Sequence, residues 1–241
     1  MRRDSFQEEG ALLWTAFLMK GWTLVMPMST ILALLGKGML VSVEIFFFTL
    51  LFSLPLGLLV SFGRMSKNFL VRSLVKIYIA IMRGTPLMLQ LLVVYFGPFY
   101  VFDMKISPGY RFVAVIIAFS INYAAYFAEI YRSGIESIPV GQYEAAKILG
   151  YNRVQTFFKI IFPQVIKRIL PPVTNETITL VKDTSLASVI AMAEMFTIAK
   201  QISAKETTIM PLMVAGVFYF IFNYIVAFVM EYIEKKFKYF R

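Results

Sequence analysis

The chain has 241 residues, of which 59% are hydrophobic, and its mean hydropathy is +0.72. That is more apolar than the core of a soluble domain requires. Cysteine and histidine are both absent, which excludes disulfides, a thiol nucleophile and cysteine-based metal sites, and removes the usual general base near neutral pH. We therefore expect an integral membrane protein with no catalytic residue, no metal site and no cofactor of its own.

Residues 1–36 form an N-terminal segment with an apolar run that is interrupted by a lysine, a glycine and a proline. We expect one or two interfacial helices here, because Trp14 and Trp22 can anchor them at the level of the lipid headgroups. The alternative is a sixth membrane span. Such a span would have to turn at residues 36–38 and would place the N-terminus in the cytoplasm.

Five apolar stretches follow, and each is near or above the ~20 residues that a helix needs to cross a bilayer. We predict five transmembrane helices, at residues 39–62, 77–102, 112–130, 170–198 and 209–233. The fourth is the most polar, and we expect it to begin or end with broken helix. The chain has no long linker and no obvious internal repeat. Residues 37–241 are therefore interpreted as one transmembrane domain.

Lysine and arginine gather after the first, third and fifth predicted spans, whereas the intervening loops hold few of them. Cytoplasmic loops of membrane proteins carry such an excess of basic residues. The asymmetry predicts an N-terminus outside the cell and a C-terminus in the cytoplasm. It also accounts for the net charge of +10 without nucleic acid as a partner. The basic residues after the three spans are Arg64, Lys67, Arg72 and Lys76; Arg132, Lys147, Arg153, Lys159, Lys167 and Arg168; and Lys235, Lys236, Lys238 and Arg241.

The loop between the third and fourth spans, at about residues 132–168, contains the pattern of a short helix. Pro139 suits a first helical turn, because its missing N–H has no partner there. Residues 140–149 would make about 15 Å of helix, and Gly150 can take the left-handed conformation that ends it. Two adjacent alanines leave little side chain, so the helix can lie close in a groove of another protein. A solvated loop helix without a partner is the alternative.

A helix break is predicted inside the second span. Thr85 stands before a proline and is pushed out of helical geometry, and Pro86 removes a backbone hydrogen bond. Broken backbone at membrane depth is tolerated where it is buried in protein or lines water. We interpret Gly84, Thr85 and Pro86 as a hinge or gate; a static kink is the alternative.

Ionisable side chains inside membrane spans are costly and usually functional. Asn122, Tyr126 and Glu129 share one face of the third predicted helix, and Glu176 and Asp183 share a face of the fourth. In one interpretation these faces line a substrate path near the midplane. In the other they hold the helices together, with Glu129 or Glu176 paired to a nearby cation. Glu129 fits the second interpretation better, and Asp183 fits the first.

The spacing of residues in the loop resembles the EAA loop of the permease subunits of bacterial ABC importers. Glu144-Ala145-Ala146 is followed after three residues by Gly150, and nine residues later by Ile160-Ile161-Phe162-Pro163. Phe162 stands where that family usually has leucine, which keeps the apolar character. Other segments between residues 38 and 231 look like the permeases of the polar amino acid importers. They lie at residues 83–90, 125–134, 170–172, 175–176 and 182–186, and at Glu194.

The resemblance implies an all-α integral membrane fold with five transmembrane helices of the type I importer permease (MetI-like) kind, in the bacterial plasma membrane. The loop helix would be a coupling helix that docks on an ATPase. A separate ATPase subunit pair would bind ATP and Mg, because the chain has no G-x-x-x-x-G-K-[ST] motif. The other implied partners are a second permease copy or homologue, an extracytoplasmic amino acid-binding protein and membrane lipid. The implied coupling residues are Glu144, Ala145, Ala146 and Gly150.

The substrate implied by the resemblance is a polar amino acid, with arginine, lysine, histidine and glutamine as candidates. The residues expected to contact it are Asn122, Tyr126, Asp183, Thr184, Ser188 and Glu194. The residues by themselves leave two other classes open. One is a secondary transporter or channel subunit that works without an ATPase, and the other is a membrane enzyme or assembly factor that uses paired carboxylates.

Overall fold

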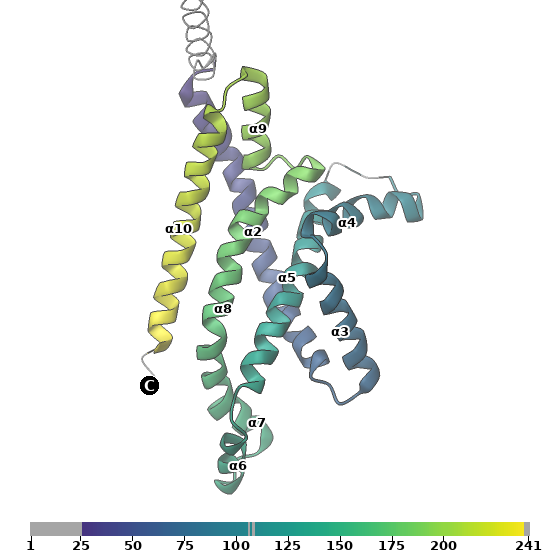
Figure 1. The fold of residues 1–241 in the computed structure, drawn as a ribbon, viewed down its shortest axis with the longest axis vertical. Helices are drawn as coiled ribbons and strands as arrows, with labels where there is room; N and C mark the ends of the chain where they lie inside the picture. Colours follow the sequence, from purple (N-terminus) through teal and green to yellow (C-terminus); the bar gives the residue numbers. More distant parts are fainter. Residues whose placement is uncertain (1–25, 106, 108, 239–241) are drawn as a thin grey trace, which may run out of the picture.

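The computed structural model describes residues 26–105, 107 and 109–238, and all regular elements within these ranges are helices. Long helices run along the longest axis of the molecule, and two shorter ones cover one end of the bundle (Figure 1). The predicted all-α fold is confirmed. The expected interfacial helices, with Trp14 and Trp22, fall outside the described residues.

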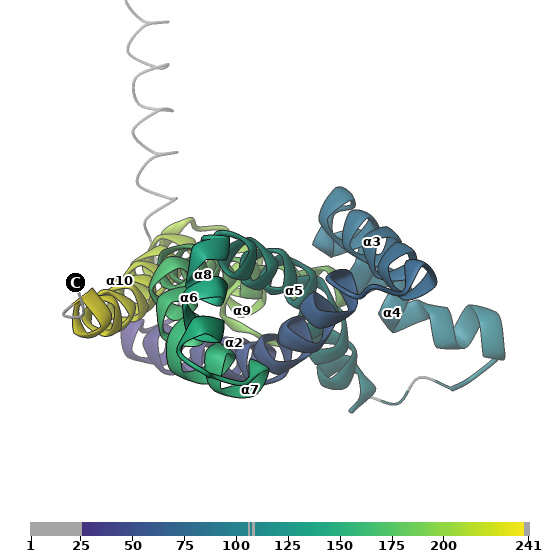
Figure 2. The ribbon, with the colours of Figure 1, turned by 90° about the horizontal axis from the view of Figure 1, so that it is seen from below.

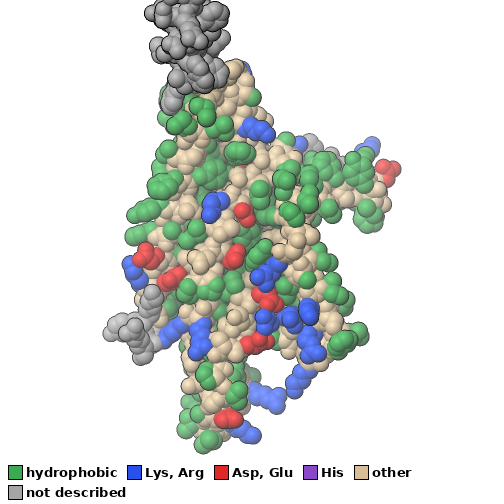
Figure 3. Space-filling view, viewed as in Figure 1, with side chains coloured by type: hydrophobic (Ala, Val, Ile, Leu, Met, Phe, Trp, Pro, Cys, Tyr) green, Lys and Arg blue, Asp and Glu red, His purple; other side chains and the backbone are tan. Residues whose placement is uncertain are grey.

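Among the described residues, three helices are long and apolar enough to cross a membrane: α2 (Met28–Arg64), α5 (Tyr110–Glu136) and α10 (Met210–Lys238). The number rises to five within the described ranges if each of two bent helix pairs makes one span. α5 and α10 cover the third and fifth predicted spans. On the face shown in Figure 3, most lysine and arginine side chains lie in the lower half, toward the end that carries the two short helices.

α2 is a single helix of 37 residues and begins at Met28 rather than at residue 39. The boundary expected at residue 36 is therefore not a helix end, and the turn that a sixth span would need there does not form. At Gly38, α2 comes close to the backbone of Met195. A Cβ on Gly38 would lie 2.8 Å from the Cα of Met195. Glycine at this position permits helix contact rather than a turn.

The second predicted span is two helices, α3 (Phe69–Gly84) and α4 (Leu87–Phe102), which meet at 109°. The break falls at Thr85 and Pro86 as predicted, and the first of the two helices begins at Phe69, earlier than the predicted start at residue 77. Thr85 has an extended backbone, with φ −122° and ψ 148°, as expected for a residue before proline. α4 consequently extends away from the other helices (Figures 1 and 2).

α5 lies at the centre of the bundle and packs against α2 through small residues. Ala124 has no exposed surface, and a Cβ on Gly57 of α2 would lie 2.8 Å from the Cβ of Phe127. Small residues let membrane helices approach closely, so that van der Waals contact can hold them. Phe119 and Phe127 then fill the main hydrophobic core together with Leu180.

The segment after α5 contains α6 (Val140–Ile148) and α7 (Arg153–Thr156), which lie at one end of the bundle (Figure 1). A π-helical turn (Phe157–Ile161) joins α7 to the long helix α8 (Phe162–Asp183). α8 packs between α5 and α10. The expected short helix over residues 140–149 is present, and Leu149 is its last, capping residue.

α8 continues into a 3₁₀-helical segment (Thr184–Ile190), and the chain then bends by 56° into α9 (Met195–Glu206). Ala191 takes a left-handed conformation at this bend, with φ 53°. The fourth predicted span, residues 170–198, is thus broken near its end, as expected from its polarity. Its helix begins earlier than predicted, since α8 starts at Phe162.

Candidate functional site in a charged cavity between α3, α5 and α8

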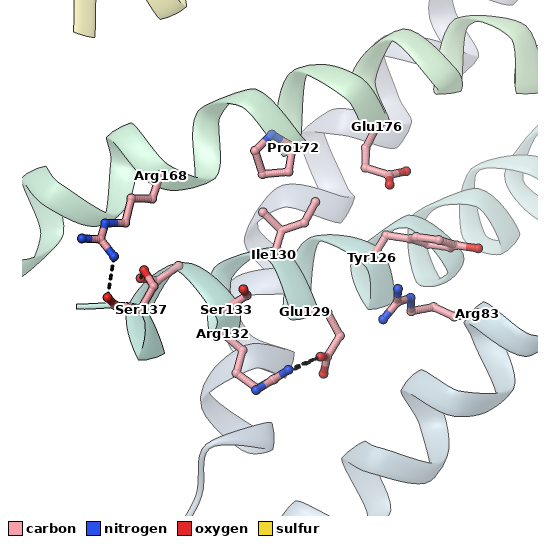
Figure 4. A pocket seen from close by; sticks show the side chains of 11 residues that line it. Arg83, Tyr126, Glu129, Ile130, Arg132, Ser133, Ser137, Arg168, Pro172 and Glu176 are labelled. Atoms are coloured by element: carbon pink, nitrogen blue, oxygen red, sulfur yellow. Dashed lines mark hydrogen bonds and ion pairs between the residues drawn. The ribbon is translucent and has the colours of Figure 1, made fainter. Parts of the chain in front are cut away.

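A cavity of about 510 Å³ lies among the side chains of α3, α5 and α8 (Figure 4). A volume of this size is typical of small-molecule sites. Its walls carry both acidic and basic groups, which is unusual for helices that cross a membrane. The residues that line it are Arg83, Tyr126, Glu129, Ile130, Arg132, Ser133, Gly134, Ser137, Arg168, Pro172 and Glu176.

Three of the charged side chains are committed to partners within the chain. Nη2 of Arg132 lies 2.6 Å from Oε2 of Glu129, and Nε of Arg64 on α2 lies 3.5 Å from Oε1 of the same carboxylate. Arg168 donates a hydrogen bond to the carbonyl of Ser137. These contacts tie α5 to α2 and α8, and the ion pair expected between Glu129 and a nearby cation is present.

The remaining two charged side chains of the wall, Arg83 and Glu176, have no hydrogen bond or ion pair with any described residue. The guanidinium of Arg83 lies over the ring of Tyr126, 5.3 Å from its centroid. Glu176 projects from α8 on the other side of Tyr126 (Figure 4). The cavity therefore holds one positive and one negative group that are available to a ligand.

Asp183 lies on the same face of α8 as Glu176 and about 10 Å further along the helix. The hydroxyl of Tyr123 donates a hydrogen bond of 2.8 Å to its Oδ2. The rings of Tyr123 and Tyr126 on α5 are neighbours, with centroids 6.2 Å apart. Two carboxylates of α8 thus face two tyrosines of α5. Of the expected substrate residues, the structure brings Tyr126 and Asp183 to this region.

Asn122 lies elsewhere, although it shares the predicted face of α5. It is buried, and its Nδ2 donates to the carbonyl of Met82 and to Oε1 of Gln90, both at 2.9 Å. Nε2 of Gln90 in turn lies 2.7 Å from the hydroxyl oxygen of Thr85 and 3.1 Å from its carbonyl oxygen. Asn122 and Gln90 therefore fix the corner formed by Gly84, Thr85 and Pro86 against α5.

Thr184 and Glu194 are fully buried and bonded internally. Thr184 donates to the carbonyl of Val181. Glu194 is the N-cap of α9, and its carboxylate accepts from two backbone N–H groups, from Thr197 Oγ1 at 2.7 Å and from Tyr219 Oη at 3.0 Å. Neither presents a free polar atom to a substrate. Ser188 is half-buried in the 3₁₀-helical segment.

The sequence interpretation missed Arg83 as a cavity residue, since it was considered only as part of the helix break. A signal was present, because an arginine within an apolar span is costly unless it faces protein or water. Arg168 and Pro172 were missed for a different reason. Arg168 lies before the predicted span begins at residue 170, and Pro172 lies at the edge of that span. Their place in the cavity wall depends on how α8 crosses α5.

α6 forms a second candidate site at the end of the bundle. The backbone of Gly150 is left-handed, with φ 78°, and the N–H of Tyr151 donates to the carbonyl of Ala146, so the predicted helix stop is confirmed. Glu144 and Ala145 are exposed, but Ala146 has no exposed surface. The methyl group of Ala146 therefore packs inside the chain, and Ala145 is the alanine of the pair that faces outward.

Apolar side chains continue this exposed surface beyond the alanine pair. Ile148 is 86% exposed and Leu149 is 72% exposed. Val140 and Val154 are exposed as well. Large apolar side chains exposed together at one end of the molecule favour a contact with another protein or with a membrane.

Broken membrane helices around a charged cavity, with an exposed helix at one end, define a membrane transport subunit. The family model of the inner membrane component of binding-protein-dependent transport systems matches residues 53–239. The L-cystine transport system permease protein TcyB of Bacillus subtilis is 34% identical over 84% of this chain and 86% of its own length. The octopine transport system permease protein OccM of Rhizobium radiobacter is 40% identical, over 73% and 76%. The chain belongs to this family, among the permeases of amino acid ABC transporters.

Solved structures agree with this assignment. A crystal structure of an amino acid ABC transporter with histidines superposes with a TM-score of 0.79 at 31% sequence identity, covering 87% of this chain and 96% of that one. The MetNI methionine transporter in an inward-facing conformation has a TM-score of 0.66 at 18% identity, covering 88% and 99%. The second likeness shows the shared MetI-like fold.

Proposed function

We propose that this chain forms the translocation path of an ATP-driven importer of polar amino acids and works by alternating access. The observation that carries the proposal is the cavity between α3, α5 and α8, where ionisable groups stand within membrane-crossing helices. Such groups mark substrate pathways in membrane proteins. Family membership supplies the transport class, and the named relatives are permeases for L-cystine and octopine.

The proposed substrate path follows one face of α8. Asp183 would accept the ammonium or the side-chain cation of an amino acid, with Tyr126 on the facing helix and Ser188 further along the path. Glu176 joins this set because it lines the cavity without an internal partner. Thr184, Glu194 and Asn122 are not retained as substrate contacts, since their polar atoms are used inside the chain.

ATP hydrolysis is proposed to occur on a separate pair of ATPase subunits, which would hold ATP and Mg. α6 would be the coupling helix, and Glu144, Ala145, Ile148 and Leu149 would contact the ATPase because they are exposed at the end of the bundle. Ala146 and Gly150 would support the helix from within, through burial and through the left-handed stop. The other proposed partners are a second permease copy or homologue and an extracytoplasmic amino acid-binding protein.

We propose that the end of the bundle with α6 lies in the cytoplasm of the bacterial cell. Basic side chains gather toward that end (Figure 3), as the positive-inside rule predicts. The C-terminus would then be cytoplasmic, and Pro27 at the start of α2 would lie on the opposite side. The corner at Gly84, Thr85 and Pro86 is proposed as a hinge or gate, because α4 swings outward at that point.

The test is Asp183→Asn in the complete transporter reconstituted in vesicles. Charge-assisted hydrogen bonds are worth roughly 1.5–3 kcal/mol each, so apparent affinity for substrate should fall about tenfold or more. Assembly yield and basal ATPase should remain near those of the wild type. Asp103→Asn is the matched control, because Asp103 is exposed at the end of α4. Wild-type transport by Asp183→Asn would reject this path.

Coupling has its own test. Ala145→Cys and Ala146→Cys differ by one position but face outward and inward respectively. The first should crosslink to the ATPase through a short bifunctional reagent, whereas the second should not. Equal crosslinking at both positions, or labelling of Ala145→Cys by an impermeant reagent from outside sealed cells, would contradict the proposed orientation.

A further inference from the structure

Arg83 is the one cation of the cavity wall, within the described residues, whose N–H groups have no acceptor. Arg132 is paired with Glu129, and Arg168 donates to the Ser137 carbonyl. Glu129 forms its ion pairs with Arg132 and Arg64, and no ion pair joins it to Arg83. An arginine inside a membrane-crossing pair of helices is costly, so its donors are expected to meet an acceptor in some state of the protein.

The chemistry of the guanidinium indicates what that acceptor is. Its Cζ lies over the Tyr126 ring, 5.3 Å from the centroid. A guanidinium carries its N–H donors at the edge of its plane, where they form a fork that matches a carboxylate. Because these donors have no acceptor among the described residues, the fork is open to a ligand. Gly84, the next residue, also has open space where a side chain would be, since a Cβ there would meet nothing within 4 Å.

The second charge of the site is Glu176. Arg83 and Glu176 line the same cavity on either side of Tyr126 (Figure 4), yet they do not form an ion pair with each other. Two opposite charges held apart across a cavity fit a molecule that carries both charges itself. The α-carboxylate and α-ammonium of an amino acid provide such a pair.

We propose that Arg83 binds the α-carboxylate of the transported amino acid while Glu176 faces its α-ammonium, so that the site selects zwitterions over simple cations. This rests on the proposed function, because it assumes that the cavity is the substrate path. Arg83 is then a specificity-determining residue. A cation without a carboxylate cannot accept the hydrogen bonds of Arg83 and is repelled by its unpaired positive charge.

The experiment measures equilibrium binding to the assembled permease–ATPase complex in nanodiscs, without the solute-binding protein. The probes are L-arginine with agmatine, L-lysine with cadaverine, L-histidine with histamine, and L-glutamine with 4-aminobutanamide. In each pair the second compound lacks only the carboxylate. Wild-type complex should prefer at least one amino acid to its partner by about tenfold or more.

Arg83→Gln should lower the affinity for the amino acid to the affinity for its decarboxylated counterpart. The affinity for the counterpart should stay the same or rise. Arg83→Lys should give an intermediate ratio, because a lysine keeps the charge but not the fork. Glu176→Gln should lower the affinity for both compounds of a pair to the same extent, since both keep the ammonium group. Arg72→Gln, on the exposed part of the same helix, should change neither.

Equal weakening of both probes by Arg83→Gln, or no change in either, would overturn the assignment of Arg83 while leaving the cavity as the path. Failure of every probe to bind the wild-type complex would reject the proposed path and this inference with it. If Arg83→Gln does not assemble, Arg83→Lys serves as the test. A wild-type ratio of the two affinities in Arg83→Lys would contradict carboxylate binding by the guanidinium of Arg83.

Discussion

Glu176 and Glu194 lie on either side of the end of α8, and they differ in how the protein treats a carboxylate among membrane helices. Glu194 is fully buried and accepts from Phe196 and Thr197 backbone N–H groups and from two hydroxyls. Glu176 is half-buried, lines a cavity and has no hydrogen-bond donor among the described residues. The first carboxylate holds α9 in place, and the second is open to a ligand.

The comparison teaches that position within a span does not separate structural from functional acids. Both residues stand in or beside the fourth predicted span, and both look alike in the sequence. What differs is the number of internal hydrogen-bond donors. A buried carboxylate whose oxygens all accept internal hydrogen bonds gains nothing from a substrate. The following variants test this distinction, beginning with the largest expected effect on stability.

Glu194→Ala should give the largest loss of folded protein. It removes the acceptor from two backbone N–H groups and two hydroxyls, and each buried donor left without a partner costs about 1–3 kcal/mol. Yield and melting temperature of the purified complex should both fall, while transport per folded complex should stay near that of the wild type. If the variant had normal stability but no longer bound substrate, Glu194 would be a substrate contact rather than a structural residue.

Gly38→Ala should destabilise the same region from the side of α2. The new Cβ would lie 2.8 Å from the backbone of Met195, which cannot move without shifting α9, and overpacking of this kind costs about 1–3 kcal/mol. Gly36→Ala is the matched control, since a Cβ there meets nothing within 4 Å. The melting temperature should fall for the first variant only. Equal melting temperatures would show that α2 and α9 do not pack closely.

Asn122→Ala should loosen the corner between α3 and α4. The change removes two hydrogen bonds, at about 0.5–1.5 kcal/mol each, and frees Gln90 from one of its partners. Hydrogen exchange of the backbone at residues 82–90 should speed up relative to the rest of α3. Asn175→Ala, at an exposed position of α8, serves as the control. Unchanged exchange would mean that proline alone holds the corner.

Glu176→Gln should have the smallest effect on stability, within about 0.5 kcal/mol, because no described donor depends on this carboxylate. Transport should nevertheless fall. A large drop in melting temperature would show that Glu176 has a structural partner, and the contrast with Glu194 would then disappear.

Much of the helical framework could be predicted from the sequence. The break at Thr85 and Pro86 and the left-handed stop at Gly150 both follow from local backbone chemistry, and both are present. The first predicted span, residues 39–62, began too late, because α2 starts at Met28 and continues through the Gly-Lys-Gly pattern. Only the contact between α2 and α9 reveals that Gly38 serves close packing.

The sequence by itself determined that the chain crosses a membrane, where its helices break, and which loop carries the short exposed helix. These features depend on apolar length and on the preferences of single residues. The tertiary structure alone decided which polar side chains are free. Tyr219, 25 residues from Glu194, is one of the donors that satisfy that carboxylate. Tyr123, 60 residues from Asp183, bonds only its Oδ2, so Oδ1 has no partner among the described residues and remains open to a ligand. Whether a carboxylate is satisfied depends on donors brought by other helices, and helical periodicity within one segment carries no information about them.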